Sequence, residues 1–296
     1  MKLIKPSFEI REQPSGLEGV YKQIEGAGRV CYKSEDKIAE GTAKAFVDRM
    51  IASGHGAMLE HGTVYLKCET EVINRYIHPE DGEEEYFNKL EKYEYNSYSV
   101  TNDDGIYLYV TTNLRVLVEN DWLDDLQYIC EPTEFHEKRI TVHFVCDRGV
   151  SHEFVRHRVM SFAQESTRYC NYSKDKFGNE LTFIQPCWLD DERLKLYGPY
   201  HTVIRDKSLE SIFIASLNNA EKDYIDLIDL GWKPQEARAV LPNSLKTELV
   251  VTGFTSDWNH FFDLRARGTT GAPHPQAKEL AEPLMKEFIA RKYINN

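Results

Sequence analysis

One short segment, Ile140 to Cys146, limits the possible folds of this chain more than any other. Its apolar residues fall at every second position, as in a strand that is covered on one face. They are Ile140, Val142, Phe144 and Cys146. Ser151 is then placed to cap a helix that begins at His152, with Glu153 in its first turn. The sequence therefore predicts a strand that leads almost directly into a helix.

The clearest helix runs from about Ser208 to Leu230, and Gly231 is placed to end it. Its apolar stripe consists of Leu209, Ile212, Phe213, Leu217, Ala220, Tyr224, Leu227 and Ile228. Further helices are predicted around 17–24, 46–51, 258–265 and 275–293, and strands at 63–68, 106–111, 181–184 and 247–252. This pattern predicts an α+β fold, with a mixed, largely antiparallel sheet packed with long helices in a single elaborated domain, 1–296.

Residues 69–138 differ in character from the rest of the chain. They are acidic and rich in tyrosine, with EDGEEEY at 80–86 and YEYNSYS at 93–99. They lack an obvious catalytic cluster, and their composition is too varied for a low-complexity segment. We interpret 69–138 as an acidic insertion in the domain.

The charge balance excludes some classes of function. The 296 residues carry a formal net charge of −12, which disfavours a general nucleic-acid binder but permits a local basic pocket for a small anion. No apolar run is long enough for a membrane helix, and the N-terminus lacks a secretion signal. The six cysteines are scattered, so we expect reduced thiols and no zinc knuckle. We predict a cytoplasmic protein without a metal, membrane or nucleic-acid partner.

The segment HEFVRH, His152 to His157, comes close to the zinc-protease signature HExxH. That signature places two histidines four residues apart, about 40° from each other around a helix. Here the spacing is five residues, which turns the imidazoles about 140° apart. The spacing therefore argues against a shared zinc ion.

Three arginines and a histidine fall between 156 and 168. Guanidinium groups suit a phosphate monoester, because each charge-assisted hydrogen bond contributes roughly 1.5–3 kcal/mol. Four polar residues form one stripe if the helix continues, or line a loop if it breaks after Met160: His157, Ser161, Gln164 and Arg168. For the RHR triplet alone, a solvated basic surface paired with Glu153 and Glu165 is the simpler interpretation.

The wider pattern resembles a known family. The run RHRVMSFAQESTR, from Arg156 through Ser166 to Arg168, is similar to the RHR-x7-S signature of the flavin-dependent thymidylate synthases. Four further segments resemble that family in the same order: GHGAMLEH (54–61), EARAVLP (236–242), DWNHFFDLR (257–265) and HPQ (274–276). The resemblance covers roughly 41–68 and 139–290.

The resemblance implies methylation of dUMP to dTMP, with methylenetetrahydrofolate as carbon donor and NADPH-reduced FAD as hydride source. It also implies a homotetramer with active sites where subunits meet. Matching positions assign dUMP to Glu153, Arg156, Gln164, Glu165, Ser166, Thr167, Arg168, Arg238 and Arg265. They assign FAD to His55, Arg156, His157, Arg158, Gln164, Phe254, Thr255, Ser256 and His260.

The resemblance makes Arg265 and Ser166 the catalytic candidates. A guanidinium beside the uracil imide favours the ionised ring and makes the methylated carbon more electron-rich. Trp258, Phe261 and Phe262 are spaced to anchor the helix that presents Arg265. A simple ion pair between Arg265 and a nearby aspartate is the structural alternative.

Three positions depart from the family pattern. Many members have glutamine where Glu153 stands and glutamate where Gln164 stands, and His260 replaces an amide. A carboxylate at 153 repels a phosphate unless an arginine pairs with it, which puts its dUMP contact in doubt.

Two other functions compete with this interpretation. Pro186-Cys187 is similar to the Pro-Cys pair of the cysteine-dependent thymidylate synthases, but two nearby aspartates disfavour a reactive thiolate at Cys187. The basic run also suits a non-catalytic nucleotide or RNA-binding module, which would be colourless and strongly salt-dependent.

Overall fold

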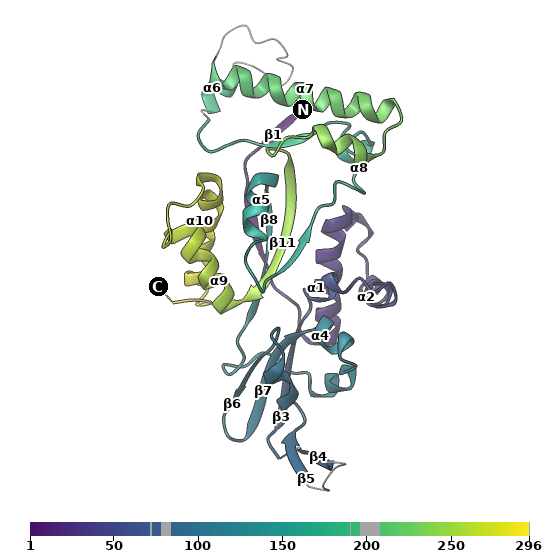
Figure 1. Cartoon of the computed structure of the whole chain (residues 1–296), viewed down its shortest axis with the longest axis vertical. Helices are drawn as coiled ribbons and strands as arrows, with labels where there is room; N and C mark the ends of the chain where they lie inside the picture. Colours follow the sequence, from purple (N-terminus) through teal and green to yellow (C-terminus); the bar gives the residue numbers. More distant parts are fainter. Residues whose placement is uncertain (72, 78–83, 190, 196–207, 296) are drawn as a thin grey trace.

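The computed structural model describes residues 1–71, 73–77, 84–189, 191–195 and 208–295. At its centre is a four-stranded antiparallel sheet with the order β2-β8-β11-β9 (Figure 1). Its strands are β2 Ser7–Arg11, β8 Arg139–Asp147, β9 Ser161–Gln164 and β11 Lys246–Phe254. The two long strands pair along their whole length, from Lys246 opposite Asp147 to Phe254 opposite Arg139.

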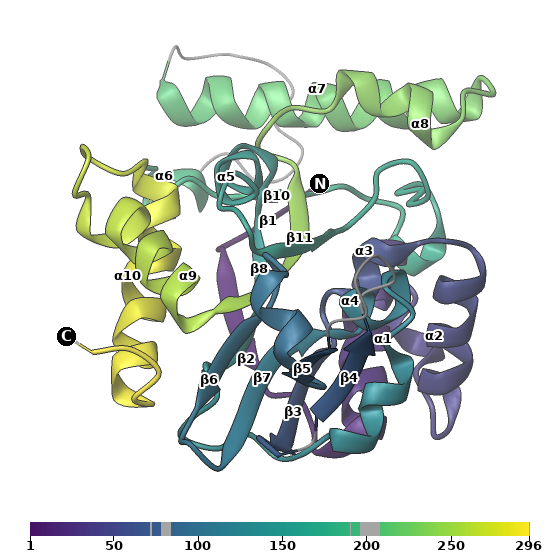
Figure 2. The same ribbon diagram turned by 60° about the horizontal axis from the view of Figure 1, so that its bottom comes forward.

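The predicted alternation of 140–146 is confirmed. Val142, Phe144 and Cys146 lie in one hydrophobic cluster with the C-terminal helices α9 Thr255–Phe262 and α10 Pro275–Ala290. Trp258, Phe261 and Phe262 are almost completely buried in that cluster, as the sequence predicts. This face of the sheet is therefore covered by the C-terminal part of the chain (Figure 2).

The other face of the sheet is covered by α1 Gly16–Tyr32, and α2 Thr42–Ala52 packs outside it (Figure 2). Val20, Ile24 and Ala27 of α1 keep one apolar face, which meets Val250 of β11 in a second cluster. Gly28 lets α1 and α2 approach closely, since a Cβ there would lie 2.4 Å from the ring of Phe46.

The chain between β3 and β8 forms a separate three-stranded sheet with the order β3-β7-β6, at the lower end of Figure 1. A two-stranded hairpin, β4-β5, lies beside it. The strands are β3 Thr63–Glu69, β4 Ile73–Ile77, β5 Glu84–Asn88, β6 Val100–Asp103 and β7 Tyr107–Asn113. The helical segments of this region are η2 Glu91–Tyr95, α4 Leu114–Glu119 and η3 Leu123–Tyr128, and the short helix α3 Gly56–Leu59 precedes β3. Part of the EDGEEEY run, 80–83, lies outside the described residues.

The long predicted helix is α7 Leu209–Asp229, which crosses the upper end of the central sheet (Figure 1). Ser208 caps it by accepting a hydrogen bond from the backbone nitrogen of Ser211. Leu217 and Tyr224 of the predicted stripe are buried, but Leu209 and Ile212 are exposed. The buried face therefore includes Ile214 in place of these two residues.

The remaining elements join these layers. They are β1 Lys2–Ile4, η1 Glu35–Lys37, α5 Arg148–Phe154, η4 Asp175–Phe177, β10 Thr182–Ile184, α6 Asp191–Lys195, α8 Pro234–Ala237, η5 Arg238–Val240 and the π-helical turn η6 Asp263–Arg267. Strand β1 pairs in parallel with β10. The predicted α+β class with largely antiparallel pairing is confirmed, although the strands are divided among several sheets. None of the helices in the described ranges is long and apolar enough to span a membrane.

Candidate functional site

The basic run begins directly after α5, and the predicted helix boundary is wrong. Asp147, not Ser151, caps α5, because its Oδ1 accepts a hydrogen bond of 2.7 Å from the backbone nitrogen of Val150. The Oδ2 of Asp147 accepts another, also 2.7 Å long, from Nε2 of Gln276 in α10. The start of α5 is thus held by its own first turn and by the last helix.

The helix ends at Phe154, so the predicted helical stripe through Arg168 is also wrong. Residues 156–158 lie in a turn, and Ser161–Gln164 forms β9, the edge strand beside β11. The alternative prediction, a break after Met160 that leaves these groups in a loop, is right that the helix breaks, but the helix already ends at Phe154, and Ser161 and Gln164 lie in a strand rather than a loop. His157 therefore does not share a helix with His152, which removes the geometry of a zinc-protease pair.

Arg265 and Glu153 meet at the end of α5. Nη1 of Arg265 lies 2.5 Å from Oε2 of Glu153, and Nη2 lies 3.0 Å from the Glu153 carbonyl oxygen. The remaining nitrogen, Nε, donates to Nε2 of His157 at 3.0 Å. The π-helical turn after α9 presents Arg265, whereas the anchoring aromatics Trp258, Phe261 and Phe262 lie in α9 itself.

His157 is held neutral at this point. Burial, then the positive charge of Arg265, and then His260 lower the pKa of His157 to about 4. Its ring also packs on Phe261, with centroids 4.9 Å apart. A neutral imidazole with a free electron pair at Nε2 is the form that accepts the Arg265 hydrogen bond.

An open pocket of about 510 Å³ lies beside this cluster. Glu153 and Arg265 form one wall, and the segment Thr270–His274 forms another. The guanidinium of Arg265 therefore borders a space that is large enough for a small-molecule ligand.

Arg156 and Arg158 flank the buried His157 and are both exposed. Within the part of the chain that the structure describes, neither forms an ion pair. Val155 and Val159 beside them are also exposed, by 37% and 41%. This turn therefore offers two free cations on a partly apolar surface.

A second group of predicted residues lies around Ser166. The backbone nitrogen of Ser166 donates to the Cys31 carbonyl at 3.0 Å, which ties this loop to the end of α1. The Ser166 hydroxyl accepts a 3.3 Å hydrogen bond from the backbone nitrogen of Arg168. Arg238 donates to the Thr167 hydroxyl at 3.0 Å, so these two predicted residues are brought together.

Glu165 and Gln164 are occupied by other groups of the protein. Glu165 is buried and accepts hydrogen bonds from Lys246, at 2.8 Å, and from the Tyr172 hydroxyl, at 3.0 Å. Gln164 donates to Ser151 of α5 at 2.8 Å and to Thr247 at 3.2 Å. Their nucleotide contacts stay predictions, and in this structure both residues position the strand that leads to Ser166.

The aromatic surroundings of Ser166 include His55. Its Nδ1 lies 3.3 Å from the Tyr32 hydroxyl, and the Tyr32 ring is 5.6 Å from the ring of Tyr169. Arg168 stacks over Tyr169, with its guanidinium carbon 5.4 Å from the ring centroid. The group therefore combines flat aromatic surfaces with an exposed cation.

The residues predicted beside a flavin at the start of α9 have a competing partner. Glu137 accepts hydrogen bonds from the Ser256 nitrogen, at 2.8 Å, and from the Thr255 hydroxyl, at 3.3 Å. Phe254 is buried, whereas His260 is exposed 5.9 Å from the ring of His157. An anion at this helix end would have to displace a carboxylate.

The predicted residues thus form two groups, around Arg265 and around Ser166. Gln164 connects them through its bond to α5, but Arg265 and Ser166 share no contact in the described structure. The described ranges also contain no group of three or more histidine, cysteine or acidic side chains placed to hold a metal ion.

Sequence reasoning missed a charged network behind Ser166. Glu248 of β11 contacts Lys33 at 2.7 Å, His143 at 2.9 Å, and Lys246, which also binds Glu165. These partners hold the pKa of Glu248 well below its usual range, against the effect of burial. Two opposite charges on one face of a strand, Lys246 and Glu248, were a possible signal of such a network. The residues that they contact are remote in sequence, so the sequence does not identify them.

Cys187 lacks the surroundings of a nucleophile. It is exposed, and partial burial followed by the charge of Glu279 raises the pKa of its thiol. A reactive thiolate needs the opposite shift.

Comparisons with known proteins confirm the family that the sequence resembles. Residues 119–291 match the family model Thy1, described as thymidylate synthase complementing protein. The flavin-dependent thymidylate synthase of Pyrococcus furiosus is 32% identical over 149 residues, 50% of this chain and 53% of that protein. The enzyme of the same name from Corynebacterium glutamicum is 28% identical over 274 residues, 86% and 71% of the two chains.

The match covers about half the length of the first of these relatives. Among solved structures, the UMP/dUMP methylase PolB from Streptomyces cacaoi bound with 5-Br dUMP is similar at 17% identity and a TM-score of 0.43. That similarity covers 98% of this chain and 93% of the PolB chain.

Proposed function

Since the chain belongs to the family of thymidylate synthase complementing proteins, we propose that it methylates dUMP to dTMP. Methylenetetrahydrofolate is the carbon donor in this proposal, and NADPH-reduced FAD is the hydride source. The single observation that supports it most strongly is the placement of Arg265, whose guanidinium borders an open pocket while Glu153 and His157 fix its orientation.

Arg265 is the residue that acts on the uracil ring. A fixed positive charge beside the imide favours its ionised form, which makes the carbon to be methylated more nucleophilic. Neutral His157 orients the guanidinium through Nε without adding a second positive charge. The proton at that carbon must then leave, which makes its release a direct readout of the reaction.

The loop 166–168 supplies the second half of the nucleotide site. We assign the dUMP phosphate to Arg168 and Arg238, and the neighbourhood of the base to the Ser166 hydroxyl. Arg238 already holds Thr167, so the loop and this cation form one unit. Glu165 and Gln164 fix the strand end that leads into the loop, through hydrogen bonds with Lys246 and Ser151 respectively.

The donor groups of the turn after α5 suit a flavin nucleotide. Arg156 and Arg158 are exposed, so their guanidinium groups are open to phosphate. The start of α9 suits a phosphate less well, because Glu137 accepts from the Ser256 nitrogen. We therefore assign the FAD phosphates to the two arginines. FAD, when bound, supplies the electrons that it receives from NADPH.

The separation of the two groups supports a homotetramer with sites between subunits. Arg265 and Ser166 lie on different parts of one chain, and the turn that carries Arg156 and Arg158 exposes Val155 and Val159. A second copy that covers this turn would bury the valines and bring another loop 166–168 to Arg265. We also retain the proposals of one domain, an insertion at 69–138 and a cytoplasmic location.

The first test is the absorption spectrum of the purified protein. A flavoenzyme is yellow and loses its visible absorbance when NADPH is added without oxygen, because the flavin accepts electrons from NADPH. Tritium release from dUMP labelled at the methylated carbon then separates a synthase from a flavin reductase. A colourless protein whose nucleotide binding falls steeply with salt would instead establish a binding module.

A further inference from the structure

A wide pocket of about 670 Å³ lies at the carboxyl ends of α1 and α2. Tyr32 is the last residue of α1 and Ala52 the last residue of α2, and both line the pocket. The two helices run side by side (Figure 2). None of the residues assigned above to dUMP or FAD lines this pocket.

Four cations line the pocket, each from a different element: Arg29 of α1, Lys37 of η1, Arg49 of α2 and Lys176 of η4. Lys37 and Arg49 are exposed, and within the described ranges neither side chain forms a hydrogen bond or an ion pair. The guanidinium of Arg49 lies over the ring of Phe46, 5.5 Å from its centroid, which leaves the N–H groups for a ligand. Lys176 is also exposed and donates to the Lys33 carbonyl. All three exposed cations can therefore be reached from the solvent.

The charges around the pocket leave it positive. Its described lining contains no carboxylate, and Arg29 is already paired with the buried Glu25 at 2.8 Å. The carboxyl ends of the two helices add about half a negative charge each. The three exposed cations outweigh these partial charges, so about two positive charges remain. Three acids stand next to the cations in the sequence, but none lines the pocket: Asp36, Asp48 and Asp175.

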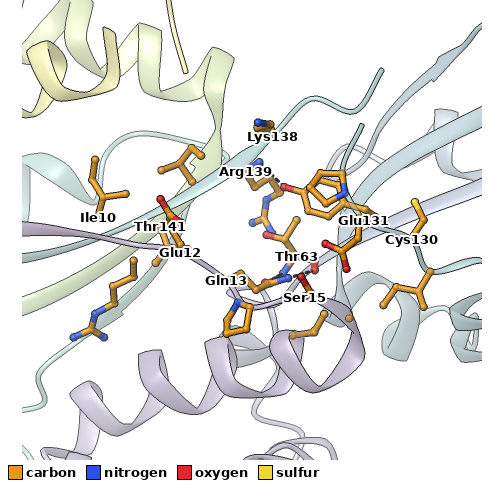
Figure 3. A pocket seen from close by; sticks show the side chains of 18 of the residues that line it. Ile10, Glu12, Gln13, Ser15, Thr63, Cys130, Glu131, Lys138, Arg139 and Thr141 are labelled. Atoms are coloured by element: carbon orange, nitrogen blue, oxygen red, sulfur yellow. Dashed lines mark hydrogen bonds between the residues drawn. The ribbon is translucent and has the colours of Figure 1, made fainter. Parts of the chain in front are cut away.

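The smaller cavity at the other end of α1 has a different charge pattern (Figure 3). Its wall carries Lys138 and Arg139 but also Glu12 and Glu131. Charges of both signs therefore border that cavity, which argues against an anion site there. In a chain with a net charge of −12, a pocket whose charged lining residues are all basic favours an anionic ligand.

Tyr32 joins the basic pocket to the group around Ser166. The Tyr32 hydroxyl lies 3.3 Å from Nδ1 of His55, and the Tyr32 ring is 5.6 Å from that of Tyr169. The preceding carbonyl, that of Cys31, accepts the hydrogen bond from the backbone nitrogen of Ser166. A ligand that reaches the base beside Ser166 can therefore extend past Tyr32 into the pocket.

The walls of the pocket favour carboxylates over a phosphate group. Phosphate sites commonly use converging backbone N–H groups, at a helix start or in a glycine-rich loop. This pocket instead adjoins two helix carboxyl ends, and its cations are long side chains from separate elements. Such a set suits a flexible ligand with several separate negative charges. An arginine also pairs with a carboxylate through two parallel hydrogen bonds.

We propose that this pocket receives the glutamyl tail of the folate that donates the carbon. Each glutamate of such a tail adds one carboxylate, so the protein binds a donor with a longer tail more tightly. The aromatic part of the donor lies beside Tyr32, and the tail carboxylates contact Lys37, Arg49 and Lys176. This inference rests on the proposed function, because it assigns a subsite to the carbon donor of that reaction.

Calorimetric titration of the full chain, loaded with FAD and dUMP, tests the proposal. The probes are tetrahydropteroylmonoglutamate and tetrahydropteroyltriglutamate, which lack the carbon to be transferred and therefore do not react. At low ionic strength, we expect the triglutamate to bind about tenfold more tightly than the monoglutamate. The ratio of the two Kd values should fall toward one as salt is added, because salt screens exposed charges.

Lys37→Met combined with Arg49→Met should reduce this ratio to less than about twofold. Lys22→Met combined with Lys222→Met is the matched control, because it removes the same charge from exposed lysines that do not line the pocket. The control should keep the ratio of the unchanged protein.

The possible failures can be told apart. Equal binding of the two probes by the unchanged protein, or a ratio that survives in the Lys37 and Arg49 variant, overturns the inference and leaves the proposed function intact. If that variant weakens NADPH binding and keeps the ratio, the pocket belongs to the hydride donor and the inference is also wrong. Binding of neither probe would remove folate as the carbon donor, and the inference would fail together with that part of the proposed function.

Discussion

The guanidinium of Arg265 donates to both the side chain and the backbone of Glu153, with Nη1 2.5 Å from Oε2 and Nη2 3.0 Å from the carbonyl oxygen. The two side chains are 17% and 28% exposed, so water screens the pair only partly. The carboxylate neutralises the charge that the proposed reaction directs at the uracil ring. Glu153 therefore competes with the substrate for Arg265.

Glu153→Gln should strengthen dUMP binding. Glutamine keeps the shape of the side chain and a hydrogen-bond acceptor but removes the competing charge, so we expect the Kd for dUMP to fall about three- to tenfold. Equilibrium titration of the flavin-loaded protein measures it. Glu287→Gln, which relieves an exposed arginine pair at the C-terminus, is the control and should leave the Kd unchanged. Weaker binding in Glu153→Gln would show that the carboxylate contributes to the site.

Arg265→Met should slow tritium release from dUMP by about 100- to 1000-fold, the usual effect of removing one preorganised electrostatic group. Arg267→Met is the matched control, because Arg267 lies in the same π-helical turn and pairs with Asp263 and Asn259 instead. It should retain most of the activity. Similar losses in both variants would mean that the turn, not the Arg265 charge, is what matters.

The stability of the fold should fall in mild acid through His157. Its pKa is about 4 in the folded protein and about 6.5 when unfolded, so the unfolded chain binds the proton first. The contribution of His157 to the free energy of unfolding is therefore complete above pH ~6.5. It is lost as the pH falls toward 4, by about 2 kcal/mol at pH 5. Urea unfolding of the protein and of His157→Asn measures it.

His157→Asn should show a smaller decrease between pH 7 and pH 5 than the unchanged protein. His260→Asn removes an exposed histidine beside it and is the control, with the decrease retained. An equal pH dependence in all three proteins would contradict the assigned role of His157.

Lys246→Met should destabilise the fold by about 3 kcal/mol, because it leaves the buried carboxylate of Glu165 without its cation. Adding Glu165→Leu should restore most of that loss, since an apolar group then replaces the unpaired charge. Urea unfolding gives both values. If the double variant is no more stable than Lys246→Met, the loss comes instead from the contact of Lys246 with Glu248.

Cys187→Ser should keep its rate of tritium release within about twofold, because partial burial and the charge of Glu279 raise the pKa of the thiol and so disfavour a reactive thiolate. Ser166→Ala, measured in the same assay, should lose most of the rate. Lost turnover in a folded Cys187→Ser protein would favour the cysteine-dependent chemistry.

The sequence was most informative where one period repeats over several residues. The alternation of 140–146 predicts both the strand and its buried face, and the aromatics around Trp258 predict the buried side of α9. Helix ends were harder to predict. Ser151 and Asp147 are both acceptable N-caps, and only the structure shows that Asp147 accepts the capping bond.

The candidate site depends on contacts that no local pattern contains. Arg265 and His157 are 108 residues apart, and the bond between them follows from the packing of α9 against β8. The strand β9 was missed because four residues are too few to establish a period. The family motif predicts that Arg265 and His157 are both site residues, but it does not indicate that Glu153 pairs with Arg265.

The bond between Gln276 and Asp147 gives a physical reason for the HPQ segment near the C-terminus. Gln276 satisfies the second oxygen of the aspartate that starts α5, and α5 in turn carries Glu153 toward Arg265. A homologue that replaces Asp147 with serine or threonine has no second oxygen to offer, and its residue 276 loses that constraint. Across related sequences, the two positions should therefore covary.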